Sequence, residues 1–183
     1  MNMFDYYYWD NVFSFKDIKE INSLIKKHRE NKEEDKTLKA SVNKTSTVYH
    51  IKFKYLKNLL ENAVSSIVSG NRYNYGYDIF KFSDEDKLNF NIYEKNQEYD
   101  WHRDVDTSKF VDVKLTALMN LSDNNFKGGE FFLLNSKNPT PVSKLDKPGS
   151  MIIFNSYILH KVNPVKKGTR KTLTIFVKGP AFK

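Results

Sequence analysis

The sequence contains no cysteine among its 183 residues. Disulfides, thiolate metal sites and cysteine nucleophiles are therefore excluded, and a reducing cytoplasm is the expected location. The sequence also lacks any apolar run that approaches the ~20 residues needed to span a bilayer. Its first residues, Met1–Asp5, show no basic segment followed by an apolar one, so we expect no secretory signal.

Positive charge is abundant, but no sustained basic block is present. The net charge is +8 and the isoelectric point is about 9.4. The lysines are scattered, with only short pairs such as Lys26-Lys27 and Lys166-Lys167. This pattern favours a solvated basic surface over a nucleic-acid interface, and an acidic partner is the better alternative. The sequence also has no internal repeat and no low-complexity linker, and it carries no signal for the oligomeric state.

The N-terminal part of the chain predicts helices. Ser14 and Asp17 form a capping-box pattern at the start of the first helix. A second helix is expected to stop at Gly70, because glycine commonly ends helices. Between the helices, β-branched residues predict a strand over Ser46–Phe53, and the charged run Glu30–Lys39 predicts a loop.

From Tyr73 onwards the sequence alternates between polar and apolar residues, with turn residues between the runs. Many short strands at such spacing are typical of a sandwich, jelly roll or barrel. We therefore predict one α+β, mainly β domain over residues 1–183, with a helical support layer that includes a strand over residues 1–72 and a β-rich core over residues 73–183. The candidate strands are Tyr75–Phe82, Leu88–Glu94, Tyr99–Val105, Val111–Leu121, Glu130–Leu134, Val142–Leu145, Ser150–Phe154, His160–Val162 and Arg170–Val177.

A metal site is suggested by His102, Asp104 and His160. The first two are two residues apart on a predicted strand, so their side chains point to the same side. Adding one imidazole from a distant strand completes a set that covers one face of an octahedral metal, which suits non-haem Fe(II) and oxygen chemistry. A His-x-Asp pair also arises by chance, and the alternative is a histidine at a hairpin end paired with a nearby acid. The other histidines, His28 and His50, are interpreted as solvated and structural.

Arg170 follows His160 on the final predicted strand, with Thr172 next on the same face. An Fe(II) oxygenase needs a two-electron co-substrate, and 2-oxoglutarate supplies one. Its distal carboxylate requires a cation inside the pocket, and the planar guanidinium fork matches a carboxylate. Taken alone, Arg170 is more commonly explained as an ordinary surface arginine in a basic protein.

Short motifs extend this pattern through the second half of the chain. In order, they are Tyr93 in Tyr-Glu-Lys-Asn-Gln-Glu-Tyr, Trp101-His102-Arg103-Asp104, Leu115–Ser122, Gly128-Gly129-Glu130, Lys147-Pro148-Gly149, His160 with Val162–Val165, and Gly168-Thr169-Arg170. On these motifs the chain from about Leu88 resembles the 2-oxoglutarate/Fe(II)-dependent oxygenases of the prolyl and lysyl hydroxylase-like branch. The ending Gly179–Lys183 is similar to that of small phage-type and bacterial members.

The resemblance implies a double-stranded β-helix, or jelly roll, with N-terminal supporting helices. It also implies Fe(II) as cofactor, 2-oxoglutarate and O2 as co-substrates, and leaves ascorbate open as a further cofactor. The residues implied as catalytic iron ligands are His102, Asp104 and His160. Arg170 would anchor the 2-oxoglutarate side-chain carboxylate, and the residues implied as assisting it are Thr172, Tyr93 and Asn120. Asn120 stands where related hydroxylases often carry a tyrosine, and Asp106 is interpreted as an acid just outside the ligand set.

The implied activity is hydroxylation of a C–H bond, with a prolyl residue of a peptide or protein as the first expectation. A nucleic-acid demethylase is the enzymatic alternative, although repair members of that type usually carry a second arginine where Phe176 stands. A small-molecule hydroxylase of the same superfamily is also open. The non-enzymatic alternative is a cupin-like metal-binding module, which an intact triad and Arg170 disfavour.

Overall fold

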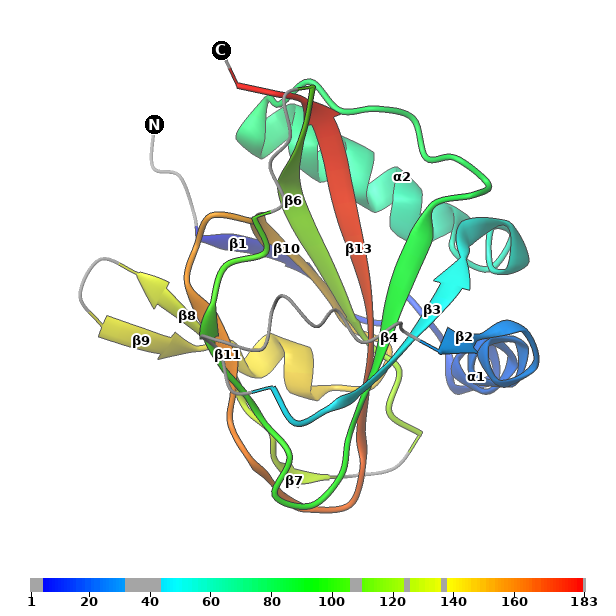
Figure 1. Cartoon of the computed structure of the whole chain (residues 1–183), viewed down its shortest axis with the longest axis vertical. Coiled ribbons are helices and arrows are strands. Elements are labelled where there is room, and N and C mark those ends of the chain that lie inside the picture. Colours follow the sequence, from blue (N-terminus) through cyan, green and yellow to red (C-terminus); the bar gives the residue numbers. More distant parts are fainter. Residues whose placement is uncertain (1–4, 32–43, 106–109, 124–125, 136–137, 183) are drawn as a thin grey trace.

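The computed structural model describes residues 5–31, 44–105, 110–123, 126–135 and 138–182 (Figure 1). Within them, most of the chain forms two antiparallel sheets. The larger sheet has the order β1-β10-β6-β13-β4-β3-β2. Its strands are β1 Tyr6–Trp9, β10 Met151–Asn155, β6 Val111–Asn120, β13 Arg170–Pro180, β4 Lys87–Tyr93, β3 Thr47–Lys52 and β2 Glu30–Asn31.

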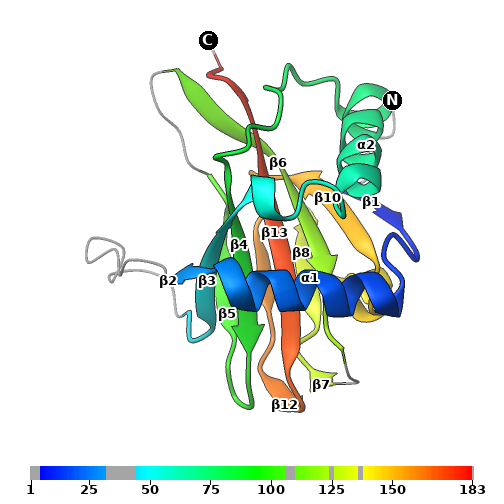
Figure 2. The same cartoon turned by 90° about the vertical axis from the view of Figure 1, so that its right-hand side faces the viewer.

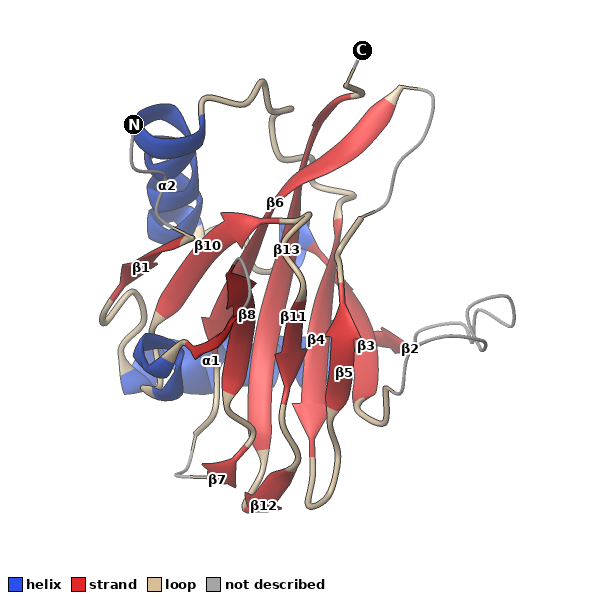
Figure 3. Ribbon diagram, turned by 90° about the vertical axis from the view of Figure 1, so that its left-hand side faces the viewer, coloured by secondary structure: helices blue, strands red, loops and turns tan. Residues whose placement is uncertain are grey.

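The smaller sheet has the order β5-β11-β8-β9, and β12 pairs with β7 beyond it. These strands are β5 Tyr99–His102, β11 His160–Val162, β8 Phe131–Asn135, β9 Asn138–Pro141, β12 Val165–Lys167 and β7 Lys127–Gly128. Figure 3 shows the smaller sheet in front of the larger one, with α1 behind both. This arrangement is the mainly β jelly roll that the sequence predicts.

Side-chain alternation along β6 and β13 explains how two cores form. Leu115, Ala117 and Met119 pack into the core beneath the helices. The intervening Leu118 faces the second core, between the sheets. The strands are buried on both faces, which is why their sequences read as nearly continuous runs of apolar and small residues.

Helix α1, Phe15–His28, lies across the outer face of the larger sheet (Figure 2). Its start follows the predicted capping box: the Ser14 hydroxyl accepts from the Asp17 N–H at 3.2 Å, and the Ser14 N–H donates to the Asp17 carboxylate at 2.8 Å. The residues that it buries are Ile18, Ile21 and Ile25. Phe15, in the first turn of the helix, is 65% exposed.

Helix α2, Glu61–Gly70, has the predicted Gly70 as its last α-helical residue. The chain continues through a π-helical turn, Asn71–Tyr75, and ends at Gly76, whose φ of 70° is left-handed. Gly70 is needed for a different reason. A Cβ there would lie 2.5 Å from the side chain of Ile153 and 2.8 Å from that of Trp9, so the helix approaches β10 closely only without a side chain at this position.

Two predicted strands are wrong. Within Tyr75–Phe82 the chain is irregular after the π-helical turn, although the Phe80 N–H donates to the Lys178 carbonyl. Within Val142–Leu145 the chain forms a 3₁₀ turn, Ser143–Asp146, closed by the Leu145 N–H donating to the Val142 carbonyl. In both segments apolar residues alternate without a neighbouring strand to pair with.

Other differences concern short strands. Strands β1, β2, β7, β9 and β12 were not predicted, and β9 occupies a predicted turn around Asn138-Pro139. The predicted loop Glu30–Lys39 begins with β2, and its residues from 32 onwards lie outside the described part of the chain. Strands β1, β2 and β3 show that the N-terminal part supplies sheet edges as well as helices. In the described residues, no helix has both the length and the apolar character needed to cross a membrane.

Candidate metal centre and adjoining carboxylate pocket

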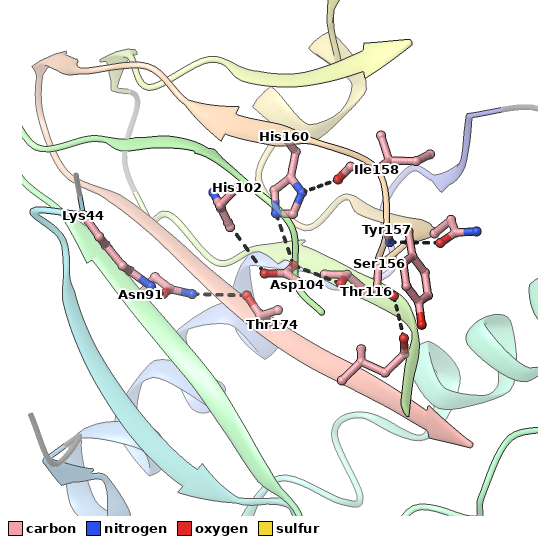
Figure 4. Close-up of polar contacts among 12 residues, drawn as sticks. Lys44, Asn91, His102, Asp104, Thr116, Ser156, Tyr157, Ile158, His160 and Thr174 are labelled. Carbon is pink, nitrogen blue, oxygen red and sulfur yellow. Dashed lines mark hydrogen bonds and ion pairs between the residues drawn. The ribbon is translucent and has the colours of Figure 1, made fainter. Parts of the chain in front are cut away.

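His102, Asp104 and His160 lie together between the two sheets (Figure 4). Strands β5 and β11 pair in antiparallel fashion with His102 and His160 directly opposite each other. Cross-strand neighbours of this kind bring two side chains to the same face of a sheet. The two rings accordingly lie with their centroids 4.1 Å apart.

The ligand atoms of the three residues are close enough to share one ion. All lie within 4.8 Å of one another. His160 Nε2 is 3.2 Å from Asp104 Oδ2, and His102 Nε2 is 3.6 Å from Asp104 Oδ1. Ligand atoms ~2.1 Å from a common ion and at right angles to it lie roughly 3.0 Å apart. The observed spacing therefore fits three adjacent positions around a metal such as Fe(II).

Backbone contacts set the orientation of both imidazoles. His102 Nδ1 is 2.7 Å from the Asp100 carbonyl, and His160 Nδ1 is 2.9 Å from the Ile158 carbonyl. Since a carbonyl only accepts, each Nδ1 is placed to donate to its carbonyl, and each Nε2 faces the shared space. Such backbone partners are the usual means of orienting metal-ligating histidines.

The Asp104 carboxylate is held by a residue that the sequence did not single out. Thr116 Oγ1, on β6, donates to Asp104 Oδ2 at 2.9 Å, and Thr116 is 1% exposed. Strand β5 ends at His102, two residues short of Asp104, so the expected strand alternation does not by itself place this side chain. The Asp104 N–H donates to the Ser156 carbonyl, and with Thr116 it turns the carboxylate towards the histidines.

Burial and nearby charge shift the pKa values of two of these groups, His102 and Asp104. Burial, reinforced by the charge of His160, lowers the pKa of His102 to about 3. Burial opposes ionisation of Asp104, but His160, His102 and the Thr116 hydroxyl outweigh it and keep the pKa of Asp104 below its usual value. At neutral pH the site thus offers a neutral His102 and an ionised carboxylate.

The triad opens onto a pocket of about 470 Å³ between the sheets. Arg170, at the start of β13, lies in this pocket and is 2% exposed. Its Nη1 has no hydrogen-bond partner, and its Cζ lies 5.4 Å from the centroid of the Tyr93 ring. Burial lowers the pKa of Arg170, although Tyr93 and Asp146 act in the opposite direction. A buried, unpartnered guanidinium is costly unless an anion enters the pocket.

Two glycines make room around Arg170. Gly128 and Gly129 have φ values of 74° and 68°, as expected for the predicted positive-φ turn. A Cβ on Gly129 would lie 3.0 Å from Arg170 Cδ and 3.0 Å from Val165 Cγ2. The glycine pair therefore shapes the floor against which the arginine side chain packs, a role that required knowledge of the tertiary neighbours.

The residues predicted to assist Arg170 divide into two groups. Tyr93 and Thr172 are buried and line the same pocket. Asn120 is not among the residues that line it, and its side chain makes its hydrogen bonds elsewhere. Its amide donates to the Leu145 and Asp146 carbonyls at 2.9 and 3.1 Å and accepts from the Ser122 N–H at 2.9 Å. Asn120 fixes the 3₁₀ turn to β6. Asp106 lies outside the described residues.

A further polar cluster in the pocket was not predicted. Asn91 Nδ2 donates to Thr174 Oγ1 at 3.1 Å, and Lys44 Nζ donates to Asn91 Oδ1 at 3.3 Å (Figure 4). Asn91 and Thr174 are buried polar residues on the pocket-facing sides of β4 and β13. Their alternation with apolar neighbours was a usable signal, but Lys44 precedes β3 and reaches them only through the fold.

Comparisons with known proteins agree with this geometry. Residues 88–178 match the family model described as the 2OG-Fe(II) oxygenase superfamily. Among curated protein sequences, none matches the chain at a significant level.

Several solved structures share the fold. One is a viral collagen prolyl hydroxylase from Paramecium bursaria Chlorella virus 1 in complex with 2-oxoglutarate, with a TM-score of 0.69 at 18% identity, covering 96% of this chain and 97% of that one. A Pseudomonas putida prolyl-4-hydroxylase has a TM-score of 0.69 at 12% identity, covering 98% and 93%. A Trichoplax adhaerens prolyl hydroxylase in complex with a peptide fragment of the hypoxia-inducible factor oxygen degradation domain has a TM-score of 0.68 at 17% identity, covering 94% and 83%.

Proposed function

Because the chain belongs to the 2OG-Fe(II) oxygenase superfamily through residues 88–178, we propose that it hydroxylates a prolyl residue in a peptide or protein. The main support for an oxygenase function is that the metal-binding triad and Arg170 share one pocket. His102, Asp104 and His160 converge on its wall, and the unpartnered guanidinium of Arg170 is buried in the same space. This pairing of a facial ligand set with a buried carboxylate-binding group fits both Fe(II) and 2-oxoglutarate.

When bound, Fe(II) and 2-oxoglutarate supply the oxidising chemistry for adding a hydroxyl group to an unactivated C–H bond. The residues of this chain bind and orient the metal, the co-substrate and the substrate. Two imidazole Nε2 atoms and the Asp104 carboxylate would hold the metal, while Thr116 keeps that carboxylate in place. Arg170 would pair with the distal carboxylate of the co-substrate, with Tyr93 and Thr172 lining the same part of the pocket. Keeping carboxylate, metal and substrate in fixed relative positions is the main contribution of the protein.

The wall around the triad supports a prolyl substrate. Tyr99 stacks on His102 with ring centroids 3.4 Å apart, and Phe154 lies edge-on to His160 at 4.9 Å. Phe131 and Phe176 also line the pocket. Apolar rings of this kind suit a compact, non-aromatic ring and exclude water from it. The solved structures with the same fold include one with a peptide bound, which is why we favour a peptide over a free amino acid.

The proposal is tested by turnover. Anaerobically prepared protein is loaded with Fe(II), mixed with 2-oxoglutarate and a library of proline-containing peptides, and exposed to air. We expect succinate to form in step with a mass gain of one oxygen atom on a peptide. Succinate formation that responds only to a free amino acid would replace the peptide assignment with a small-molecule one. Absence of succinate from protein that has bound both metal and 2-oxoglutarate would contradict oxygenase activity altogether.

A further inference from the structure

Two cationic residues, Arg103 and Lys178, line the exposed mouth of the pocket. Arg103 stands between the ligands His102 and Asp104, and Lys178 lies near the end of β13. Among the described residues that line the pocket, Asp104 is the sole carboxylate, and the metal site accounts for it. The mouth therefore carries positive charge that no acid among the described lining residues offsets.

Backbone contacts bring the two cations to the same end of the pocket. Arg103 Nε donates to the Tyr157 carbonyl at 2.9 Å. The neighbouring Ser156 hydroxyl donates to the Val113 carbonyl. Val113 is in turn the cross-strand partner of Lys178 in the pairing of β6 with β13. Arg103 and Lys178 thus flank Val113, which itself lines the pocket.

The charged ends of both side chains are unengaged within the described part of the chain. The only hydrogen bond of the Arg103 side chain there is the one from Nε, which leaves the two terminal guanidinium nitrogens, and Lys178 Nζ has no hydrogen-bond or ion-pair partner. The nearest acid along β6, Asp112, is already paired with Lys114 at 3.4 Å and accepts from the Phe182 N–H. Lys44, the remaining pocket lysine, donates to Asn91.

This cationic mouth is separate from the carboxylate site at Arg170. Arg170 and Lys178 are eight residues apart on β13, which is roughly 26 Å of extended chain. The triad lies between them, because Thr116, which holds Asp104, pairs across strands with Phe176. An anion at the mouth would thus approach the metal from the side opposite the co-substrate carboxylate.

We infer that Arg103 and Lys178 select a substrate that carries a carboxylate near the carbon to be hydroxylated. Resting on the proposed function, this specifies an acidic peptide, with Asp or Glu close to the target proline. The two cations affect substrate binding, whereas the oxidation step depends on the triad. An exposed ion pair changes affinity by roughly 2- to 5-fold, so the two together change it by about 5- to 20-fold at low salt, and less when salt screens the charges.

Matched peptides test this inference. One series places Glu next to a single proline, a second replaces that Glu with Gln, and a third replaces it with Lys. Values of kcat and KM are measured from succinate formation for the wild type, Arg103→Glu, Lys178→Glu and the control Lys19→Glu. Lys19 is exposed on α1, outside the pocket. We expect the wild type and the control to favour the Glu peptide through KM, and both mouth variants to shift the preference towards the Lys peptide.

Direct binding separates this inference from the proposed function. Fluorescence anisotropy of the same peptides with the Mn(II)-loaded protein reports the carboxylate preference without turnover. Equal affinity for the Glu and Gln peptides, or no change of preference in the mouth variants, would overturn the inference even if both peptides are hydroxylated. A clear Glu preference in binding without succinate formation on any peptide would instead retain the cationic site and contradict the proposed hydroxylation.

Discussion

Replacing Thr116 with valine removes the hydroxyl that orients the metal-binding carboxylate while nearly preserving side-chain volume. The Thr116 hydroxyl donates to Asp104 Oδ2 at 2.9 Å, and Thr116 itself is 1% exposed. A hydrogen bond to a charged group contributes about 1.5–3 kcal/mol. Residues that support metal ligands typically affect affinity by about 10- to 100-fold. We therefore expect Fe(II) to bind Thr116→Val about 10- to 100-fold more weakly.

The assay is an anaerobic Fe(II) titration by chelator competition, with thermal unfolding of the metal-free protein as a check on folding. Thr174→Val is the matched control, since Thr174 is a buried pocket-facing threonine whose hydroxyl accepts from Asn91 and does not contact the triad. A Thr116→Val affinity within twofold of the wild type would refute the role assigned to this hydroxyl. Equal losses in both variants would show that the effect belongs to the pocket as a whole.

Three further predictions follow from the site and the fold. Arg170→Lys keeps the charge but loses the planar fork, so titration of the Mn(II)-loaded protein should show 2-oxoglutarate binding at least about tenfold more weakly; an unchanged Kd would contradict the anchor. Because the pKa of His102 is about 3 in the fold and 6.5 in the unfolded chain, the unfolded state takes up the proton first as pH falls. Metal-free protein should therefore lose up to about 3 kcal/mol of stability between pH 6.5 and about 4, and urea unfolding of His102→Gln should lack this component. Gly70→Ala should destabilise the protein by about 1–3 kcal/mol because the new Cβ meets Ile153 and Trp9, whereas Ser69→Ala, on the exposed side of α2, should not.

His102, His160 and Arg170 were accessible from the sequence because they lie on predicted strands, whereas Asp104 lies beyond the end of β5 and is placed by its tertiary contacts. Strand alternation places Arg170 and Thr172 on one face, and the predicted strand at His160 forms where expected. The many short alternating runs predicted a sandwich, jelly roll or barrel, and the family resemblance selected the jelly roll among them. The predicted strand faces and ligand types need only the period of a strand and the donor chemistry of the side chains.

Features set by distant neighbours could not be predicted. Thr116 acquires its role because β6 passes beneath Asp104, and Asn120 because a 3₁₀ turn lies against it. Gly70 was predicted to end a helix because glycine commonly does so, but the close approach of β10 explains why a glycine is needed at this position. The irregular segment after Tyr75 alternates like a strand, yet strand formation requires a partner and none is adjacent along its length within the described residues.

The central claim is that His102, Asp104 and His160 hold one iron per chain. Its most direct test is the stoichiometry of Fe(II) bound under anaerobic conditions by the wild type, His160→Ala and His28→Ala. His28 stacks on Tyr55 at the end of α1, remote from the triad, and serves as the matched control. We predict one Fe(II) per chain in the wild type and in His28→Ala, and loss of binding in His160→Ala. Full iron binding by His160→Ala, or its loss in His28→Ala, would contradict the account.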